Sequence, residues 1–164
     1  MGLNFSMTGL FYNKALAARI GMTQPPATLA ELDTVLQKAK DAGITPINQF
    51  NGGATGGLAF PLQNLMAAYG ETGPINDWIF QKPGASIQTP ANLQAAQHLE
   101  RWIKAGYFAD DINSQDYATM MSRFIGGQNL FIFNGDWESG NLDKQMAGNA
   151  GFLLMPPARA GGAR

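Results

Sequence analysis

The sequence contains no cysteine, a single histidine and few charged residues, and each shortage excludes a class of function. Without cysteine, neither a disulfide nor a thiolate zinc site can form. With His98 as the one histidine, a metal site or a Ser–His–Asp triad has almost no support. Charged residues make up 14% of the chain and the net charge is -1, so the charge does not favour nucleic acid or an anionic membrane as a partner. We therefore expect no metal, no cofactor and no nucleic acid.

Long apolar runs are also absent. None approaches the roughly 20 residues of a membrane-spanning helix, and the N-terminus lacks the basic and apolar segments of a signal peptide. The 164 residues, of which 45% are hydrophobic, suffice for one domain with a core but are short for two. Both ends look excised from a larger protein, because the first predicted strand begins almost at Met1 and the chain ends in a loop.

Short apolar segments alternate with helical patterns along the chain. We predict strands over 3–12, 44–50, 129–133 and 150–155, a strand or hairpin over 74–83, and helices that start near 14, 29, 58, 90, 115 and 138. This order predicts an α/β domain, a three-layer αβα sandwich in which helices cover both faces of a mostly parallel sheet. Ligands bind such sheets at the carboxyl ends of the strands.

Several positions carry local signals. Thr28 and Glu31 have the spacing of a capping box, and Thr89 precedes a proline at the first position of a helix. Ser114 is the predicted cap of the helix that follows it. Gly9, within the first strand, indicates a bulge or the close approach of another segment.

Two helices have predicted core faces. On the helix after Pro90, apolar side chains repeat at helical spacing, which places Trp102 in the core and His98 off the main apolar face. The residues predicted to form the two faces are Leu93, Ala96, Leu99, Trp102 and Ile103 on this helix, and Tyr117, Met120, Met121, Phe124 and Ile125 on the next.

The segment that ends the third strand is the strongest candidate for a binding site. It runs Asn134–Gly135–Asp136–Trp137 and presents a large flat apolar side chain among small hydrogen-bonding groups. A sugar ring can stack its C–H face on an indole while its hydroxyls bind amides and carboxylates. The alternative is that Trp137 fills the core beneath the turn. The loop Asn51–Gly57 follows another strand, so we expect it at the same edge of the sheet.

Asp136 and Glu138 form the one close pair of carboxylates in this candidate site. Paired carboxylates can hydrolyse glycosides, so a glycoside hydrolase is an alternative function. Two residues apart in a turn, however, carboxylates usually diverge rather than flank one bond. Asp136 also precedes a helix, and a capping role is the simpler interpretation, which is compatible with accepting a sugar hydroxyl as well.

The chain resembles the extracellular solute-binding proteins of carbohydrate ABC transporters, the maltose-binding-like family. The resemblance runs through nearly the whole chain in order. It consists of the segments LFYNK (10–14), GM…PPAT…E (21–31), WIKAGY (102–107), F-x-x-G…GDW (124–137) and GF…PP (151–157).

The resemblance implies a fold, a function and a site. It implies one lobe, residues 1–164, of a periplasmic-binding-protein type II clamp, which closes on a mono- or oligosaccharide, docks on a membrane permease and catalyses nothing. The parent protein would be periplasmic or an extracellular lipoprotein. The site residues carried over are Trp137 as the stacking platform, with Gly135, Asp136, Ser6, Asn51 and Thr55 around it.

The chain also departs from the family pattern. Asp136 replaces a more usual serine or proline, and the loop Asn51–Gly57 lacks an aromatic residue that some members have. The N-terminal lobe and the C-terminal extension are missing, which implies an isolated C-terminal lobe, a truncated or engineered fragment with weakened sugar binding. Exposed lobe surfaces would then favour a homodimer. A ligand-free, self-associating scaffold is a further alternative.

Overall fold

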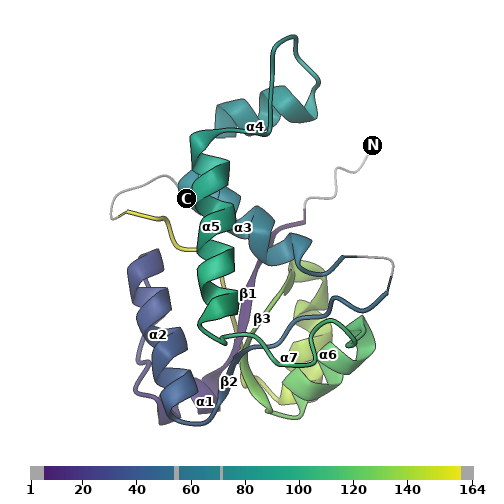
Figure 1. Ribbon diagram of the computed structural model, residues 1–164. Helices are drawn as coiled ribbons and strands as arrows, with labels where there is room; N and C mark the ends of the chain where they lie inside the picture. Colours follow the sequence, from purple (N-terminus) through teal and green to yellow (C-terminus); the bar gives the residue numbers. More distant parts are fainter. Residues whose placement is uncertain (1–5, 54–55, 71, 160–164) are drawn as a thin grey trace.

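The computed structural model describes residues 6–53, 56–70 and 72–159 (Figure 1). Thr55 lies outside this part of the chain. The elements in the described residues are β1 (Thr8–Asn13), α1 (Lys14–Arg19), α2 (Leu29–Asp41), β2 (Thr45–Ile47), α3 (Ala59–Tyr69), α4 (Thr72–Ile79), α5 (Pro90–Lys104), α6 (Tyr117–Ile125), β3 (Asn129–Gly135), a 3-10 turn (Asp136–Glu138), α7 (Ser139–Met146) and β4 (Ala150–Leu153). None of the helices in these residues is long and apolar enough to cross a membrane.

The four strands form one sheet in the order β2-β3-β1-β4. β2 and β3 are the one parallel pair of neighbours, whereas β1 is antiparallel to both β3 and β4, so two of the three neighbouring pairs are antiparallel. The prediction of a mostly parallel sheet is therefore wrong. The composition of a strand does not encode its direction, and β1 enters the sheet at the edge where β2 and β3 end, with Thr8 opposite Gly135. Gly9 follows the regular register, and a Cβ there would crowd the carbonyl of Leu153, so the predicted close approach is confirmed without a bulge.

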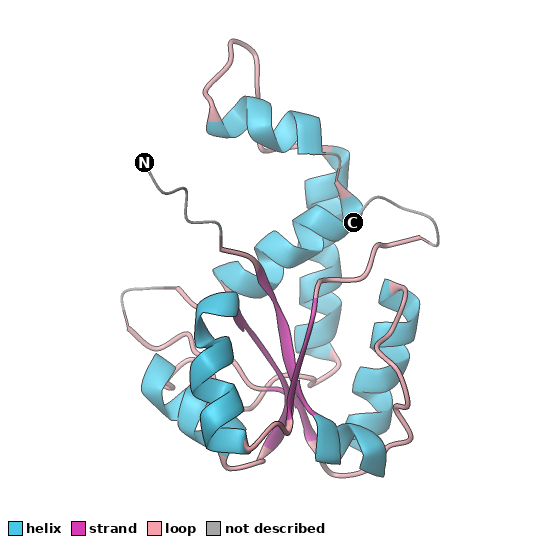
Figure 2. Ribbon diagram, turned by 180° about the vertical axis from the view of Figure 1, so that it is seen from behind, coloured by secondary structure: helices cyan, strands magenta, loops and turns pink. Residues whose placement is uncertain are grey.

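Helices cover both faces of this sheet, as Figures 1 and 2 show. Side chains of α1, α2, α3 and α5 pack on one face against Leu10, Phe131 and Phe133. Side chains of α6 and α7 pack on the other face against Phe11 and Ile132. Neighbouring residues of a strand thus enter opposite cores, as the alternation of side chains requires. The predicted three-layer αβα sandwich is confirmed.

The capping signals are confirmed in two of three cases. The hydroxyl of Thr28 accepts the amide N–H of Glu31, and the Glu31 carboxylate accepts from Ala27, one residue before the cap. Thr89 caps α5 as predicted. Ser114 does not cap α6, because its hydroxyl donates to the carbonyl of Asp111, and Asp116 accepts the amide of Thr119 instead.

The segment 74–83 is not a strand or hairpin, since α4 covers most of it. Pro74 lies in the first turn of α4, where a missing N–H costs no hydrogen bond. Ile75, Trp78 and Ile79 have helical spacing, and Ile75 packs beside Gly70 at the end of α3. The apolar side chains that suggested a strand are exposed, with Phe80 at 74%.

The buried face of α5 differs from the predicted one. Trp102 is in the core as expected, but Leu93 is 60% and Ile103 is 50% exposed. The buried side chains are Ala95, His98, Leu99 and Trp102. His98 can be buried because both ring nitrogens have partners, Nε2 with the Asp33 carboxylate at 2.9 Å and Nδ1 with the Tyr69 hydroxyl at 2.7 Å.

The stability that Asp33 contributes should depend on pH. Burial tends to raise the pKa of this carboxyl, but hydrogen bonds from His98 and Trp102 outweigh burial and lower the pKa below its ordinary 3.8. A lowered pKa in the folded state adds stability above the unfolded pKa, and this stability is lost as the pH falls through the folded pKa. We expect Asp33→Asn to lower the free energy of unfolding at neutral pH, with the deficit shrinking at about pH 3. Urea unfolding at both pH values measures the difference in unfolding free energy between the variant and the unchanged protein. Asp41→Asn, which replaces an exposed carboxylate on the same helix, is the control.

Candidate functional site

Trp137 lies in the 3-10 turn that follows β3, at the edge of the sheet where β2 and β3 end. Its side chain is 51% exposed, so it does not fill the core. The six-membered ring lies over Gly135, where a Cβ would overlap it, and its centroid is 6.4 Å from that of the Phe60 ring on α3. One face of the indole therefore packs on the backbone of Gly135, and about half of the side chain remains accessible to a ligand.

Asp136 ties this turn to the chain that enters β1. Its amide donates to the carbonyl of Met7 at 2.9 Å, and its carboxylate accepts the amide of Met7 at 3.2 Å. The expected capping role is therefore wrong, because the carboxylate pairs with a distant backbone amide instead of the helix that follows. Ser6 adjoins Met7 and is exposed. The structure thus brings Ser6, Gly135, Asp136 and Trp137 together.

Glu138 is held by two neutral donors. The Tyr117 hydroxyl donates to one carboxylate oxygen at 2.8 Å, and the Asn141 amide donates to the other at 2.8 Å. The same hydroxyl accepts from the Asn134 amide at 3.0 Å, so Tyr117 bridges the residues before and after the turn. Burial raises the pKa of Tyr117, which keeps the hydroxyl a donor at neutral pH. The sequence pattern indicated a core position for Tyr117 but gave no signal for this bridge.

We expect Tyr117→Phe to loosen the turn without unfolding the domain. The ring keeps its edge-on contact with Phe50, at 5.3 Å between centroids, but both hydrogen bonds of the hydroxyl are lost. Two lost bonds, one to a charged acceptor, correspond to about 1–3 kcal/mol of unfolding free energy. Chemical denaturation measures this loss. Tyr12→Phe on β1 is the matched control, and an equal loss in both variants would contradict a specific role for the bridge.

The loop Asn51–Gly57 is joined to the end of β3 by the buried side chain of Gln49. Its amide accepts from the N–H of Phe133 and donates to the carbonyl of Phe133, and it also donates to the carbonyl of Gly57. Asn51 is partly buried, and its side chain donates to Asn113 on a neighbouring loop at 2.9 Å. Asn51 thus lies at the predicted edge with its amide group already engaged.

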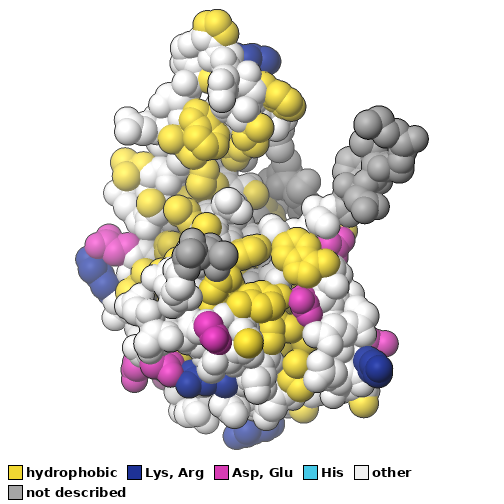
Figure 3. All heavy atoms as spheres, turned by 90° about the vertical axis from the view of Figure 1, so that its right-hand side faces the viewer, with side chains coloured by type: hydrophobic (Ala, Val, Ile, Leu, Met, Phe, Trp, Pro, Cys, Tyr) yellow, Lys and Arg dark blue, Asp and Glu magenta, His cyan; other side chains and the backbone are white. Residues whose placement is uncertain are grey.

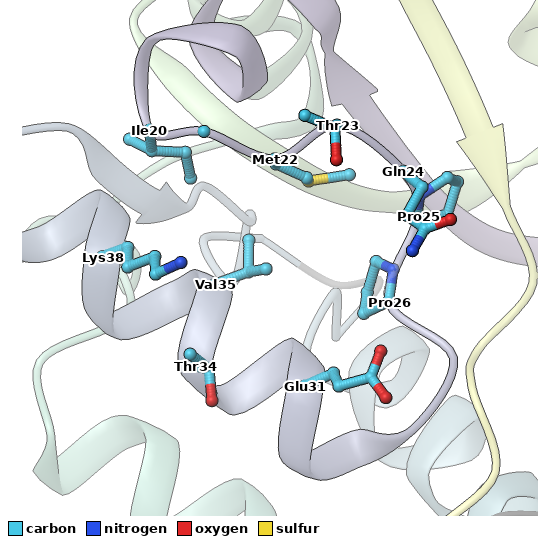
Figure 4. A pocket seen from close by; sticks show the side chains of 11 residues that line it. Ile20, Met22, Thr23, Gln24, Pro25, Pro26, Glu31, Thr34, Val35 and Lys38 are labelled. Carbon is cyan, nitrogen blue, oxygen red and sulfur yellow. The ribbon is translucent and has the colours of Figure 1, made fainter.

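A separate hollow lies between the α1–α2 connection and α2 (Figure 4). These two helices lie on the other side of the sheet from α6 and α7 (Figure 1). Its volume is about 280 Å³. Met22 on the connection and Val35 on α2 face each other across it, and Glu31 and Lys38 lie toward its two ends. No predicted site residue lines it. Within the described ranges there is also no cluster of three His, Asp or Glu side chains that could hold a metal ion.

The sequence from residue 1 to residue 163 matches the model of a family described as bacterial extracellular solute-binding protein. The chain belongs to this family. The description of the family names an extracellular binding role. No curated protein sequence matches the chain significantly.

This solute-binding protein is also similar to solved structures of longer proteins. A chitin oligosaccharide binding protein has a TM-score of 0.83 and 26% identity, over 94% of this chain and 39% of that one. A sugar transporter protein from Bacillus licheniformis, in complex with stachyose, has a TM-score of 0.74 and 19% identity, over 94% and 41%. Maltose-bound MalE3 of T. maritima has a TM-score of 0.71 and 18% identity, over 93% and 39%. This solute-binding protein therefore spans about two fifths of the length of these relatives.

Proposed function

We propose that this chain is a sugar-binding lobe, of the C-terminal type, from the solute-binding protein of a carbohydrate ABC transporter. The observation that carries the proposal is the half-exposed indole of Trp137 at the carboxyl ends of β2 and β3. Membership of the family supports a binding role, and two of the solved relatives are a chitin oligosaccharide binding protein and a protein in complex with stachyose. The complete protein would be periplasmic or an extracellular lipoprotein and would deliver the sugar to a permease.

In this proposal a sugar ring stacks on the free face of Trp137 and its hydroxyls bind the polar groups beside the indole. A carboxylate oxygen can accept more than one hydrogen bond, so Asp136 and Glu138 keep acceptor capacity beyond their present partners. Ser6 adjoins Met7, which is hydrogen-bonded to Asp136, and its hydroxyl would contribute from the chain that enters β1. Asn51 and Thr55 would contribute from the loop after β2, and Gly135 serves by leaving room for the indole.

The lobe alone should bind weakly. Known sugar sites bury most of the ligand surface, whereas one lobe covers one side of a ring. The share of the relatives that this chain spans is consistent with a second lobe on the opposite side. Trp78 on α4 and Phe80, which follows α4, are exposed apolar side chains. Such exposed apolar surface favours the homodimer that we expect at high concentration.

A glycoside hydrolase is a weaker candidate. Hydrolysis needs one carboxyl that donates a proton to the leaving oxygen and another that acts opposite it. Here Asp136 accepts an amide N–H, and Glu138 accepts a hydroxyl and an amide. Both carboxylates are thus already engaged as hydrogen-bond acceptors by groups of the protein itself. We expect no turnover of chromogenic glycosides.

The proposal is tested by fluorine NMR of the chain labelled with 5-fluorotryptophan. Trp137→Phe, Trp78→Phe and Trp102→Phe assign the three signals. We expect N-acetylglucosamine trisaccharide to shift the Trp137 signal in a saturable way at millimolar concentration, with the exposed Trp78 and the buried Trp102 unaffected. Equal shifts of Trp78 and Trp137 would indicate non-specific contact, and no shift with a panel of neutral oligosaccharides would favour the ligand-free scaffold. Micromolar affinity would contradict the expectation of weak binding.

A further inference from the structure

We propose that the Trp137 site selects uncharged and amino sugars and rejects acidic sugars such as uronates. This inference rests on the proposed function, because it specifies the class of sugar that the same site takes. It follows from the charges around the indole rather than from the indole itself.

The two side chains that flank Trp137 in sequence, Asp136 and Glu138, are both carboxylates. The Asp136 carboxylate accepts from the backbone of Met7, and Glu138 accepts from Tyr117 and Asn141. Among the described residues, neither takes part in a salt bridge. Their negative charges are therefore held in place by neutral donors and remain uncompensated.

The elements beside the indole supply few cations, and on α7 the one lysine, Lys144, lies in the last turn, away from the start of the helix that follows Trp137. Between Lys40 and Lys82 the sequence has no lysine or arginine, and this stretch contains β2, the loop Asn51–Gly57 and α3. On α6, Arg123 binds both carboxylate oxygens of Asp111, at 2.9 and 2.7 Å. Asp116 adds a further negative charge at the start of α6.

The surface view agrees with this distribution. Figure 3 shows acidic side chains bordering the hydrophobic group in the middle of this face, whereas the basic side chains visible there lie farther from that group. A uronate stacked on the indole would bring a third carboxylate to this group. An ammonium group on the sugar would meet two carboxylates instead. Bound sugar also excludes water, which strengthens both the repulsion and the attraction.

The test compares three β-1,4 trisaccharides that differ in charge. The probes are the trimer of N-acetylglucosamine, the glucosamine trimer with protonated amines, and an N-acetylglucosamine trimer oxidised to carboxylates at C6. We expect the acidic trimer to bind at least tenfold more weakly than the neutral one, and the glucosamine trimer to bind at least as tightly. Fluorine NMR of Trp137 gives each dissociation constant.

Charge-neutral variants separate electrostatics from fit. We expect Glu138→Gln and Asp136→Asn each to reduce the difference between the dissociation constants of the neutral and the acidic trimer. The control is Asp41→Asn, which removes an exposed carboxylate on α2 and should leave this difference in affinity unchanged. The difference should also decrease as salt rises from about 0.02 M to about 0.5 M, since exposed charges are screened. Circular dichroism confirms that each variant is folded.

The outcomes distinguish the inference from the proposed function. If the acidic trimer shifts Trp137 with the affinity of the neutral trimer, the site binds sugar but the charge selection is wrong. If the difference in affinity between the neutral and the acidic trimer is unchanged in both site variants and at high salt, it arises from shape rather than from charge, and the inference is again wrong. If no trimer shifts Trp137, the proposed function fails and the inference with it.

Discussion

A Gly135→Ala variant is expected to fold normally and to lose the sugar response of Trp137. The backbone at Gly135 is extended (φ -101, ψ 159), which any residue can adopt, so alanine introduces no backbone strain. Its Cβ, however, would overlap the six-membered ring of Trp137. Because the indole is half-exposed, it can swing into solvent at little cost to the fold. The tryptophan then remains in the chain, but its indole no longer lies where a sugar ring can stack on it.

The size of this effect can be compared with that of removing the indole. We expect Gly135→Ala to weaken sugar binding as much as Trp137→Ala does, beyond the measurable range, with less than about 1 kcal/mol change in unfolding free energy. Gly140→Ala on α7 is the control, since nothing lies within 4 Å of a Cβ there and alanine favours a helix. Retained binding in Gly135→Ala would show that the indole can stack on sugar from another position.

Gln49→Leu is expected to be the most destabilising polar substitution in the domain. β2 ends at Ile47, and beyond it the fully buried Gln49 side chain pairs with both the N–H and the carbonyl of Phe133, as a backbone peptide would. Leucine fills similar space but leaves these two groups and the carbonyl of Gly57 without this partner. Each buried group left unsatisfied costs about 1–3 kcal/mol, so we expect a loss of about 3–5 kcal/mol.

Urea denaturation of the Gln49→Leu variant measures this loss. The control is Gln63→Leu on the exposed side of α3, which should change the unfolding free energy by less than about 0.5 kcal/mol. Hydrogen exchange should also show the amide of Phe133 less protected. A loss below about 1 kcal/mol in Gln49→Leu would mean that water or a shifted loop replaces the amide.

Local signals in the sequence predicted much of the fold. Thr28, Glu31 and Thr89 act through contacts within five residues, so their caps could be recognised from spacing alone. The core face of α6 follows from its regular apolar pattern, and Met120, Met121 and Phe124 are buried as expected. Apart from α4, which was predicted as a strand or hairpin, the strands and helices, their order and the three layers were predictable on this basis.

Apart from α4 and the cap of α6, the errors concern contacts between distant parts of the chain. His98 is buried because Asp33 and Tyr69, on other helices, satisfy its ring nitrogens, and no pattern within α5 shows those partners. Asp136 pairs with Met7, 129 positions away, rather than with the helix beside it. The direction of β1 likewise depends on how the layers assemble. For the candidate site, the turn with Trp137 was identified from its composition, but Tyr117 was not.

The paired hydrogen bonds between Met7 and Asp136 have a mechanical consequence. They extend the β1–β3 ladder to the point where the backbone leaves the sheet, one residue before the indole. Met7 is hydrogen-bonded to the turn itself, so no unpaired residues lie between the chain that enters β1 and the turn. A rotation of the chain at residue 6 should therefore change the orientation of the indole. A rigid element attached at this point would set the angle at which the indole ring meets its ligand.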